Sequence, residues 1–497
     1  MAKKASLSLP DKEFFRLVSQ AAFSNPFSDE RIELDLKIGE CPPDLSIVER
    51  LECVTERIQE RVGKLEALGA ADIRLYSGDE RTTMQSAFMF EIYFLFSSQF
   101  DRLIPNQLEA GEKSCPVPFG GEAIAMFLKR GFNIKEACRY FAILYQIKRA
   151  YYFIDEGLIG QSASMKNLRL HLWNNVFTFD IWLYDRFLLN RMEDFSTLLL
   201  GDTGTGKGTA AGAIGRSGYI PYDRDKGLFR ESFMSSFISI NLSLYAESLI
   251  ESELFGHKKG AFTGAIKQHR GIFSRCSPYG SILLDEIGDV SLPVQLKLLQ
   301  LLQDRIFSPV GSHEKLRFNG RVIAATNRSL DELREKGHFR SDFYYRLCSD
   351  CIVVPSLFER IQENPRELDL ILTNIIGRLT GEESQELVSL VKASIRSHLG
   401  DQYPWPGNVR ELEQASRRIL LTKEYKGDTV IRKTGIREKL ISGVDSGNLN
   451  AQQLLSGYCA LLYDRYGTYE GVSRRMNLDR RTVKRHIELS KGLKGRP

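Results

Sequence analysis

A glycine-rich stretch between an apolar segment and a run of small residues constrains this chain of 497 residues more than any other feature. The apolar segment, 197–200, is typical of a buried strand, and the small residues at 210–213 favour a helix. Glycines at such a junction let backbone N–H groups surround phosphate oxygens, and a lysine adds positive charge. The pattern therefore predicts an α/β nucleotide-binding domain. Its phosphate-binding loop comprises Gly201, Asp202, Thr203, Gly204, Thr205, Gly206, Lys207, Gly208 and Thr209.

The residue after the lysine departs from the usual pattern of such loops. A Ser or Thr normally follows the lysine and holds Mg²⁺, whereas here Gly208 follows and Thr209 comes one position later. We therefore expect magnesium to depend on Thr209 and, to a greater extent, on acidic groups elsewhere in the chain.

Paired acidic residues end a second apolar segment, 281–284. A strand that ends beside the phosphate-binding loop can present Asp285 to a metal ion and Glu286 to the attacking water. A third apolar segment, 322–326, ends in Asn327, whose amide can orient that water or contact the γ-phosphate. The two segments predict two further strands at the same nucleotide site.

Two arginines, Arg340 and Arg346, lie close together downstream of these strands. One interpretation is a solvated helix face. The other is a pair of arginines that reach the γ-phosphate of a neighbouring subunit, where such groups accelerate hydrolysis by about 10³–10⁵.

The motif that carries a family resemblance is Leu-Phe-Gly-His-Lys-Lys-Gly-Ala-Phe-Thr-Gly-Ala at 254–265. Together with the phosphate-binding loop, 284–288, 325–328 and Trp-Pro-Gly-Asn-Val-Arg-Glu-Leu at 405–412, it resembles the sigma-54-dependent transcription activators of bacteria, which are AAA+ ATPases. The resemblance extends over roughly residues 195–425. It implies a parallel sheet flanked by helices with a small helical lid, ATP hydrolysis with Mg²⁺, and a ring oligomer, which is a hexamer in the family.

The resemblance also implies roles for individual residues. Asp285 and Glu286 are similar to the Walker B pair, and Asn241 resembles the asparagine that switches the glutamate of that pair. Asn327 resembles the residue called sensor one, and Arg410 resembles sensor two.

Two further elements are implied by the same resemblance. Arg340 and Arg346 are similar to arginine fingers that act on the nucleotide of a neighbouring subunit. The end of the long motif resembles the loop tip that contacts the sigma factor. A phenylalanine between two glycines suits that role, because it gives a mobile segment with one apolar anchor. The tip comprises Gly260, Ala261, Phe262, Thr263, Gly264 and Ala265.

The chain departs from the family pattern in three places. Gly208 replaces the usual Glu, and residues 217–237 lengthen the connection before Asn241, which predicts an inserted loop. The region 1–175 lacks the strand-terminal acids of a receiver domain. We therefore interpret it as a regulatory or sensor region of unknown type.

The region 1–175 nevertheless has the patterning of a folded, mainly helical α+β region. Alternating apolar residues at 32–38 predict a half-buried strand, and apolar residues spaced by three or four at 47–65 predict a helix. Asn133 and Glu136 have the spacing of a capping box at the start of another helix.

Other groupings are better explained by core packing than by a special site. Aromatic residues are concentrated at 88–100 and 140–153, and a packed core is favoured there over a cofactor pocket. Cys348 and Cys351 form an isolated pair, whereas structural zinc normally takes four ligands, so buried core thiols are expected.

The positive charge of the chain is concentrated at its C-terminal end. Residues 430–497 contain 14 Lys and Arg against 6 Asp and Glu, a net of +8, so the remainder of a chain with total charge +5 sums to −3. A basic tail indicates a polyanionic partner.

Within this tail, residues 468–489 predict a helix–turn–helix. Thr468 and Asp479 are placed to cap its two helices, and Val483 and Ile487 to pack inward. The unit resembles the Fis-type DNA-binding domain, although a basic solvated helix has the same composition. The residues expected to contact double-stranded DNA are Arg480, Arg481, Thr482, Lys484 and Arg485.

No run of about 18 uncharged apolar residues and no signal-peptide pattern occurs in the sequence, so we expect a cytoplasmic protein without a membrane partner. The expected organisation is an N-terminal region 1–175, an α/β nucleotide-binding subdomain 176–355, a helical lid 356–430, a linker 431–448 and a helix–turn–helix domain 449–497.

The leading hypothesis is a DNA-bound transcriptional regulator whose ring uses ATP hydrolysis to remodel sigma-54 RNA polymerase and open promoters. One alternative is an ATP-binding regulator with little hydrolysis, for which Gly208 is the support. A second alternative is an AAA+ remodeller of another protein substrate.

Overall fold

The computed structural model describes residues 7–427, 440–441, 443–444, 447 and 449–491. Contacts divide the chain into two compact units, Met1–Tyr425 and Lys426–Pro497. The linker expected at 431–448 falls mostly outside the described residues.

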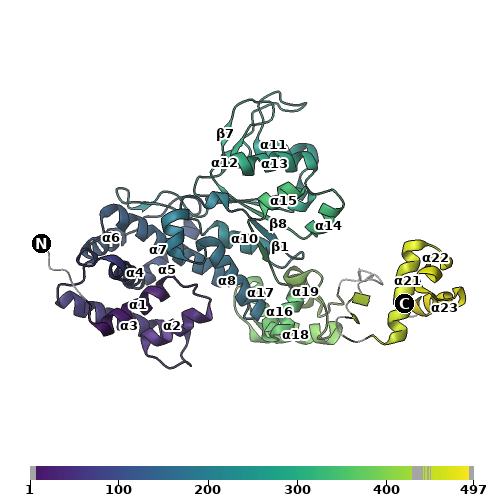
Figure 1. Ribbon diagram of the computed structural model, residues 1–497, viewed down its shortest axis with the longest axis horizontal. Coiled ribbons are helices and arrows are strands. Elements are labelled where there is room, and N and C mark those ends of the chain that lie inside the picture. Colours follow the sequence, from purple (N-terminus) through teal and green to yellow (C-terminus); the bar gives the residue numbers. More distant parts are fainter. Residues whose placement is uncertain (1–6, 428–439, 442, 445–446, 448, 492–497) are drawn as a thin grey trace. The chain divides into compact units, whose positions relative to one another are not determined.

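A five-stranded parallel sheet forms the centre of the first unit, with the strand order β4-β5-β8-β1-β9 (Figure 1). The apolar segments predicted as strands are confirmed as β1, β5 and β8. The strands are β1 (Thr197–Leu200), β4 (Phe237–Asn241), β5 (Ser281–Asp285), β8 (Arg321–Thr326) and β9 (Asp350–Val353).

Side chains alternate between the two faces of this sheet, as strand geometry requires. On β5, Ile282 and Leu284 belong to one apolar core, whereas Leu283 belongs to another. The first of these cores lies under helices α11, α13 and α15. The flanking helices on this side are α11 (Glu247–Phe255), α12 (Ile272–Arg275), α13 (Leu292–Asp304), α14 (Leu330–Glu335) and α15 (Ser341–Leu347).

The opposite face of the sheet shares its core with the N-terminal region. Leu199, Leu283 and Ile323 belong to one continuous buried cluster that extends to Phe15 at the start of the described chain. Helix α10 (Lys207–Gly215) contacts both α7 and α8 at this face. The N-terminal helices are α1 (Leu9–Phe23), α2 (Asp29–Gly39), α3 (Ile47–Ala67), α4 (Gly78–Leu95), α5 (Ser97–Ala110), α6 (Gly120–Lys129), α7 (Ile134–Asp155) and α8 (Ala163–Phe177).

The strand predicted at 32–38 is wrong, because these residues lie inside helix α2. Ser28 caps that helix by accepting a hydrogen bond from the Arg31 N–H. Leu34 and Ile38 are buried on one face at the spacing of a helical turn. The helix predicted at 47–65 is confirmed as α3, and the capping box of Asn133 starts α7.

The segment 217–237 is more ordered than the inserted loop predicted from the sequence. It contains a short hairpin of β2 (Tyr222–Asp223) and β3 (Leu228–Phe229). Its aromatic rings pack on α7, with centroids 4.2 Å apart for Phe229 and Tyr145 and 4.8 Å apart for Tyr222 and Phe141. The insertion therefore attaches the N-terminal helices to the sheet.

A buried arginine strengthens the same attachment. Arg149 of α7 donates hydrogen bonds to the carbonyl oxygens of Arg216 and Gly218, both at 2.7 Å. Gln146, one turn earlier, donates to the carbonyl oxygen of Ser217 at 2.9 Å. These three carbonyls directly follow α10, which places α7 at the end of the helix that begins at the phosphate-binding loop.

Four helices after the sheet form a small separate core around Leu372, Trp405 and Leu412. They are α16 (Leu357–Glu363), α17 (Arg366–Thr380), α18 (Gln385–Leu399) and α19 (Asn408–Thr422). They follow β9 in the chain, α16 packs against α8, and the four helices are grouped on one side of the sheet as a lid (Figure 1).

The described residues 449–491 of the second unit form three packed helices. Val472, Val483 and Ile487 are buried with Cys459 and Leu462 in its core. The helices are α21 (Ala451–Tyr466), α22 (Tyr469–Met476) and α23 (Arg480–Lys491). Across the described residues of both units, no helix combines the length and apolar character needed to cross a bilayer.

Candidate nucleotide site

The phosphate-binding loop connects β1 to α10 in a conformation that requires glycine. Gly201, Gly204 and Gly206 have φ of 149°, 81° and 106°, a backbone region that favours glycine. A Cβ at Gly204 would also overlap the carbonyl oxygen of Gly407 in the lid. The turn is therefore shaped by both its own backbone and the element packed on it.

Side chains from two strand ends meet beside this loop. Asn241 of β4 pairs in register with Asp285 of β5, and both lie at the carboxyl end of the parallel sheet. A cavity of about 420 Å³ is lined by both, by Glu286 and by the loop residues Thr203 to Thr209. Ligands of open α/β sheets bind at this edge. The predicted loop residues from Thr203 onward and the Asp285–Glu286 pair thus share one cavity, whereas Gly201 and Asp202 line a different pocket with Asn327.

Burial shifts the pKa values of two charged groups in the cavity, Lys207 and Glu286. Lys207 is 8% exposed, and its Nζ donates to the carbonyl oxygens of Gly201 and Asp202 at 2.8 and 2.9 Å. Desolvation lowers the pKa of Lys207, opposed by Glu286 and Asp285. Desolvation, and then the charge of Asp285, raises the pKa of Glu286. The Oε2 atom of Glu286 is buried and has no hydrogen-bond partner among the described residues.

Asn327 and Asn241 are engaged by other polar groups. The Nδ2 of Asn327 donates to Thr203 Oγ1 at 2.7 Å, which joins β8 to the phosphate-binding loop. The Oδ1 of Asn241 accepts from the backbone N–H and the hydroxyl of Ser243, at 3.0 and 2.7 Å. Asn241 therefore caps the turn that follows β4, while lining the cavity.

The two arginines predicted as fingers lie outside this cavity. Arg340 forms an ion pair with Asp342, with Nη2 2.8 Å from Oδ2, and its side chain is 38% exposed. Arg346 donates to the carbonyl oxygen of Leu302 at 2.8 and 3.0 Å. Neither side chain serves the nucleotide cavity of its own chain in this arrangement.

The lid contacts the phosphate-binding loop through the start of α19. Arg410 lines the cavity, and the N–H of Val409 donates to the carbonyl oxygen of Gly204 at 3.2 Å. Asn408, which is 1% exposed, donates to the Thr203 carbonyl oxygen and accepts from the Leu357 N–H, at 3.0 and 2.7 Å. Asn408 thus connects the loop to two lid helices, a role that its place in the 405–412 motif did not reveal.

One wall of the cavity comes from residues that carry no sequence motif. They are Leu158, Ile159, Met165 and Leu168, all within the region expected to be N-terminal, and they line the cavity together with the lid residue Ile375. Apolar side chains beside a phosphate-binding loop suit the base of a nucleotide. The sequence signals for this wall are weak. They are the apolar pair Leu158 and Ile159, then Gly160 and the helix cap Ser162, and such a pattern also occurs before helices that only pack in a core.

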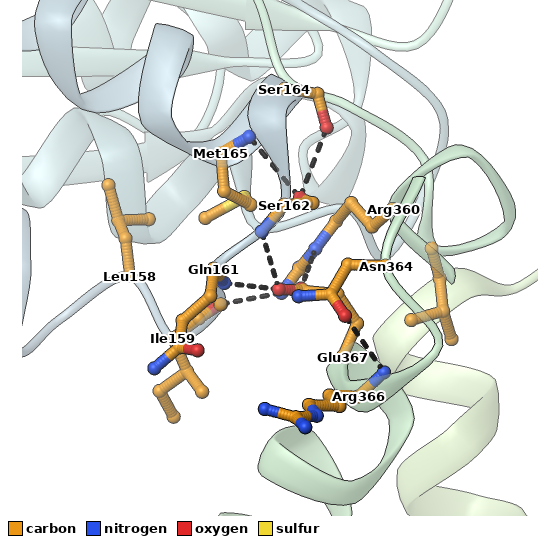
Figure 2. A network of polar contacts seen from close by, with 12 residues as sticks. Leu158, Ile159, Gln161, Ser162, Ser164, Met165, Arg360, Asn364, Arg366 and Glu367 are labelled. Atoms are coloured by element: carbon orange, nitrogen blue, oxygen red, sulfur yellow. Dashed lines mark hydrogen bonds and ion pairs between the residues drawn. The ribbon is translucent and has the colours of Figure 1, made fainter. Parts of the chain in front are cut away.

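Figure 2 shows how this wall is attached to the lid. The carboxylate of Glu367 accepts hydrogen bonds from the N–H groups of Gln161 and Ser162 and from the guanidinium of Arg360. Arg360 also donates to the carbonyl oxygen of Ile159 at 2.5 Å. Glu367 and Arg360 are 0% and 4% exposed. The chain at 159–162 is therefore held by a buried ion pair of the lid.

The segment resembling a sigma-contact tip projects from the sheet together with a neighbouring hairpin, β6 (Ile306–Phe307) and β7 (Leu316–Arg317) (Figure 1). Gly260 and Gly264 have φ of 82° and 104°, and the Gly260 N–H donates to the Ala265 carbonyl oxygen at 2.8 Å. Phe262 is 37% exposed, whereas Ala265 is buried. The tip is a closed turn that presents Phe262 and Thr263 outward.

The helix–turn–helix expected in the tail is present in the second unit. Thr468 caps α22, and Asp479 accepts from the N–H groups of Arg481 and Thr482 at the start of α23. The Thr482 hydroxyl donates to the same carboxylate, so its proton is already used in capping. The basic side chains Arg480, Arg481, Lys484 and Arg485 are exposed.

The two cysteines at 348 and 351 lie at the edge of the core under α11, α13 and α15. Both are only partly buried, so the prediction of buried thiols is wrong in degree. The described residues contain no cluster of three or more His, Cys, Asp or Glu that could hold a metal ion.

The fold and the cavity define an α/β nucleotide-binding domain with a helical lid, and comparison with known proteins gives its family. Residues 186–352 match the family model described as the sigma-54 interaction domain. This part of the chain is therefore a sigma-54 interaction domain of the AAA+ ATPase family.

Curated relatives agree with this assignment. The chain is 41% identical over 229 residues to a Nif-specific regulatory protein of Azotobacter vinelandii, covering 46% of this chain and 40% of the relative. It is 34% identical over 305 residues to the regulatory protein AtoC of Escherichia coli, covering 58% and 61%. The match therefore spans about half the length of these relatives. A crystal structure of NtrX from Brucella abortus matches at 18% identity and a TM-score of 0.38, covering 74% of this chain and 79% of that one.

We predict that Glu367→Gln destabilises the first unit by about 3–5 kcal/mol, because it leaves the buried Arg360 without its charged partner. Nucleotide affinity should fall as well, since Glu367 holds the segment that carries Leu158 and Ile159. Urea unfolding and nucleotide titration of the full chain measure the two effects.

The matched control is Glu386→Gln, at an exposed position in the first turn of α18. Its free energy of unfolding should stay within about 0.5 kcal/mol of the native value. Equal stability of the Glu367 and Glu386 variants would contradict the structural role given to Glu367.

Proposed function

We propose that this protein is an ATP-driven activator of sigma-54-dependent transcription. The observation that carries the proposal is the chain path between two residues of the nucleotide cavity. Asn241 and Asp285 both line the cavity, and the projecting tip 260–265 is inserted in the chain between them. A change at the γ-phosphate of ATP can therefore reach the tip through either end of the segment that carries it.

The cavity suits ATP with magnesium. Oxygen ligands are what Mg²⁺ prefers, and Asp285 and Thr209 both line the cavity. The Oε2 atom of Glu286 is buried and has no hydrogen-bond partner among the described residues. It can therefore accept a hydrogen bond from a water or from a hydrated ion. Mg²⁺ held by Asp285 and Thr209 would neutralise charge on the phosphates. Glu286 would take a proton from the attacking water, and Lys207 and Arg410 would bind phosphate oxygens.

The position of the arginines supports a proposed ring assembly. Arg340 and Arg346 lie outside the cavity of their own chain, so we propose that they complete the site of a neighbouring copy in a hexameric ring. The ion pair of Arg340 with Asp342 is exposed, and such surface pairs contribute only about 0–1 kcal/mol to stability. Breaking it so that Arg340 can contact a phosphate therefore costs little free energy.

Glu286→Gln tests hydrolysis against the alternative of a regulator that only binds ATP. We expect magnesium-dependent phosphate release to fall by about 10²-fold or more, with ATP affinity changed less than threefold, because an amide accepts no proton. The control Glu335→Gln lies at an exposed position of α14 and should release phosphate at the native rate. A native protein that binds ATP without phosphate release would support the alternative instead.

Thr263→Ala tests the partner of the tip. The variant should hydrolyse ATP at the native rate but fail to open a sigma-54 promoter, because Thr263 is exposed and remote in sequence from the cavity residues. Gln268→Ala, also exposed in the same segment, is the control. Normal promoter opening by the Thr263 variant would favour the alternative of another protein substrate.

The second unit supplies the proposed DNA contact. An exposed basic helix with an inward apolar face suits the major groove of double-stranded DNA, with α23 as the recognition helix. Asp479 holds the helix start, which leaves Arg480, Arg481, Lys484 and Arg485 for phosphates and base edges.

We expect Arg485→Gln to weaken DNA binding and to reduce the slope of log affinity against log salt by about 1. The control is Arg465→Gln, where an exposed arginine of α21 lies 6.0 Å from the ring centroid of Tyr466. Fluorescence anisotropy over a salt series measures both slopes. Identical slopes for the two variants would argue against α23 as the DNA-contacting helix.

A further inference from the structure

A second cavity, of about 470 Å³, lies within the N-terminal helices. This volume is in the range of pockets that hold small molecules. Its walls are formed by side chains of α1 to α4, α7 and α8 and the turns between them, together with Ser97 at the start of α5 and Ile181 after α8. The cavity is separate from the nucleotide site, with which it shares no lining residue.

The walls of this cavity are rich in aromatic rings. Phe27 is stacked on Tyr151 with ring centroids 5.5 Å apart and meets Trp173 edge-on at 6.1 Å. Phe90, Tyr93 and Phe23 also line the cavity. Flat apolar walls of this kind favour an aromatic ligand, because stacked and edge-to-face rings add to the burial of apolar surface. The aromatic concentrations at 88–100 and 140–153 thus form more than a closed core.

The charged groups of the cavity differ in how closely they are paired. Arg31 donates to Asp35 at 2.8 Å and to the carbonyl oxygen of Ala21 at 3.1 Å. Lys148 bonds Ser97 at 3.0 Å and Asp101 at 2.9 Å. The carboxylate of Asp155, which also lines the cavity, lies 3.5 Å from Arg169 Nε.

Among these groups, Arg50 has the longest ion pair. Its side chain lines the cavity and the residue is 9% exposed, yet its Nε has no hydrogen-bond partner among the described residues. The nearest carboxylate is that of Asp35, with Oδ2 3.9 Å from Nε, and Arg31 already occupies that group. A buried guanidinium nitrogen without a hydrogen-bond partner is unfavourable, and a carboxylate accepts hydrogen bonds from a guanidinium in pairs.

We propose that this cavity binds a small aromatic monocarboxylate, with the carboxylate paired to Arg50 and the ring held between Phe27, Phe90 and Trp173. The aromatic walls select the ring, and the Arg50 guanidinium, whose Nε has no hydrogen-bond partner among the described residues and whose one ion pair, to Asp35, is at 3.9 Å, selects the anion. Neither feature depends on ATP hydrolysis or on sigma-54, so the proposal stands apart from the function proposed above.

Two helices connect this cavity to the nucleotide site. Helix α8 carries Trp173 to the N-terminal cavity and both Met165 and Leu168 to the nucleotide cavity. Helix α7 contributes Tyr151 to the same cavity, while its Arg149 bonds the backbone that ends α10. A ligand that orders these helices would alter nucleotide affinity, and reciprocally, through rigid packed elements.

The test is calorimetric titration of the full chain with indole-3-acetate and phenylacetate, alongside their uncharged amides and the non-aromatic octanoate. Trp173 gives a second signal, because a ring bound against it should change tryptophan fluorescence. We expect the aromatic carboxylates to bind at least tenfold more tightly than either the amides or octanoate.

Arg50→Gln should weaken binding of indole-3-acetate at least tenfold and leave that of indole-3-acetamide unchanged. The matched control, Arg57→Gln, removes an arginine of the same helix that pairs with Glu40 and Glu60 outside the cavity, and should bind as the native chain does. A second variant, Leu51→Trp, fills the cavity from α3 and should abolish binding whether or not Arg50→Gln folds.

Three results would overturn the proposal. The first is that neither aromatic carboxylate binds at millimolar concentration. The second is that the amides bind as tightly as their acids. The third is that the Arg50 and Leu51 variants both bind with native affinity. Octanoate that binds as tightly as indole-3-acetate would overturn the aromatic selectivity.

Discussion

A parallel sheet must be covered on both faces, and the rest of this structure depends on how that requirement is met. Backbone and apolar side chains on an open face would be exposed to water, so parallel sheets occur with helices on each side. Here one face is covered by α11, α13 and α15, and the other by α10 together with the N-terminal helices α7 and α8. The N-terminal region is thus part of the sheet's own packing.

The nucleotide cavity is formed by the same sheet and by elements that pack around it. Its floor is the edge of the sheet, where Asn241 and Asp285 are in register, and its walls come from elements far apart in the chain. The lid provides Arg410, and the segment that leads into α8 provides Leu158 and Ile159. The buried carboxylate of Glu367 holds these two walls together. The nucleotide cavity, the lid and helix α8 are therefore physically connected.

Strands and helix caps were predictable from the sequence where they depend on interactions between residues close together in the chain. Strands β1, β5 and β8 follow from short apolar runs, and the caps at Asn133 and Thr468 follow from side chains that bond the nearest backbone N–H groups. The segment 32–38 shows the limit. Alternating apolar residues indicate a strand, but packing against α1 and α3 makes a helix the better way to bury Leu34 and Ile38.

The sequence by itself determined the chemistry of this protein: a phosphate-binding loop, an acidic pair after a strand, a glycine-bounded tip and a basic helix. These signals are contiguous because backbone conformation and charge act over a few residues. Tertiary structure alone decided which distant residues share a cavity. Leu158, Glu367 and Asn408 at the nucleotide site, and Arg50 beside Trp173, carry no local signal, since their roles arise only when the helices pack.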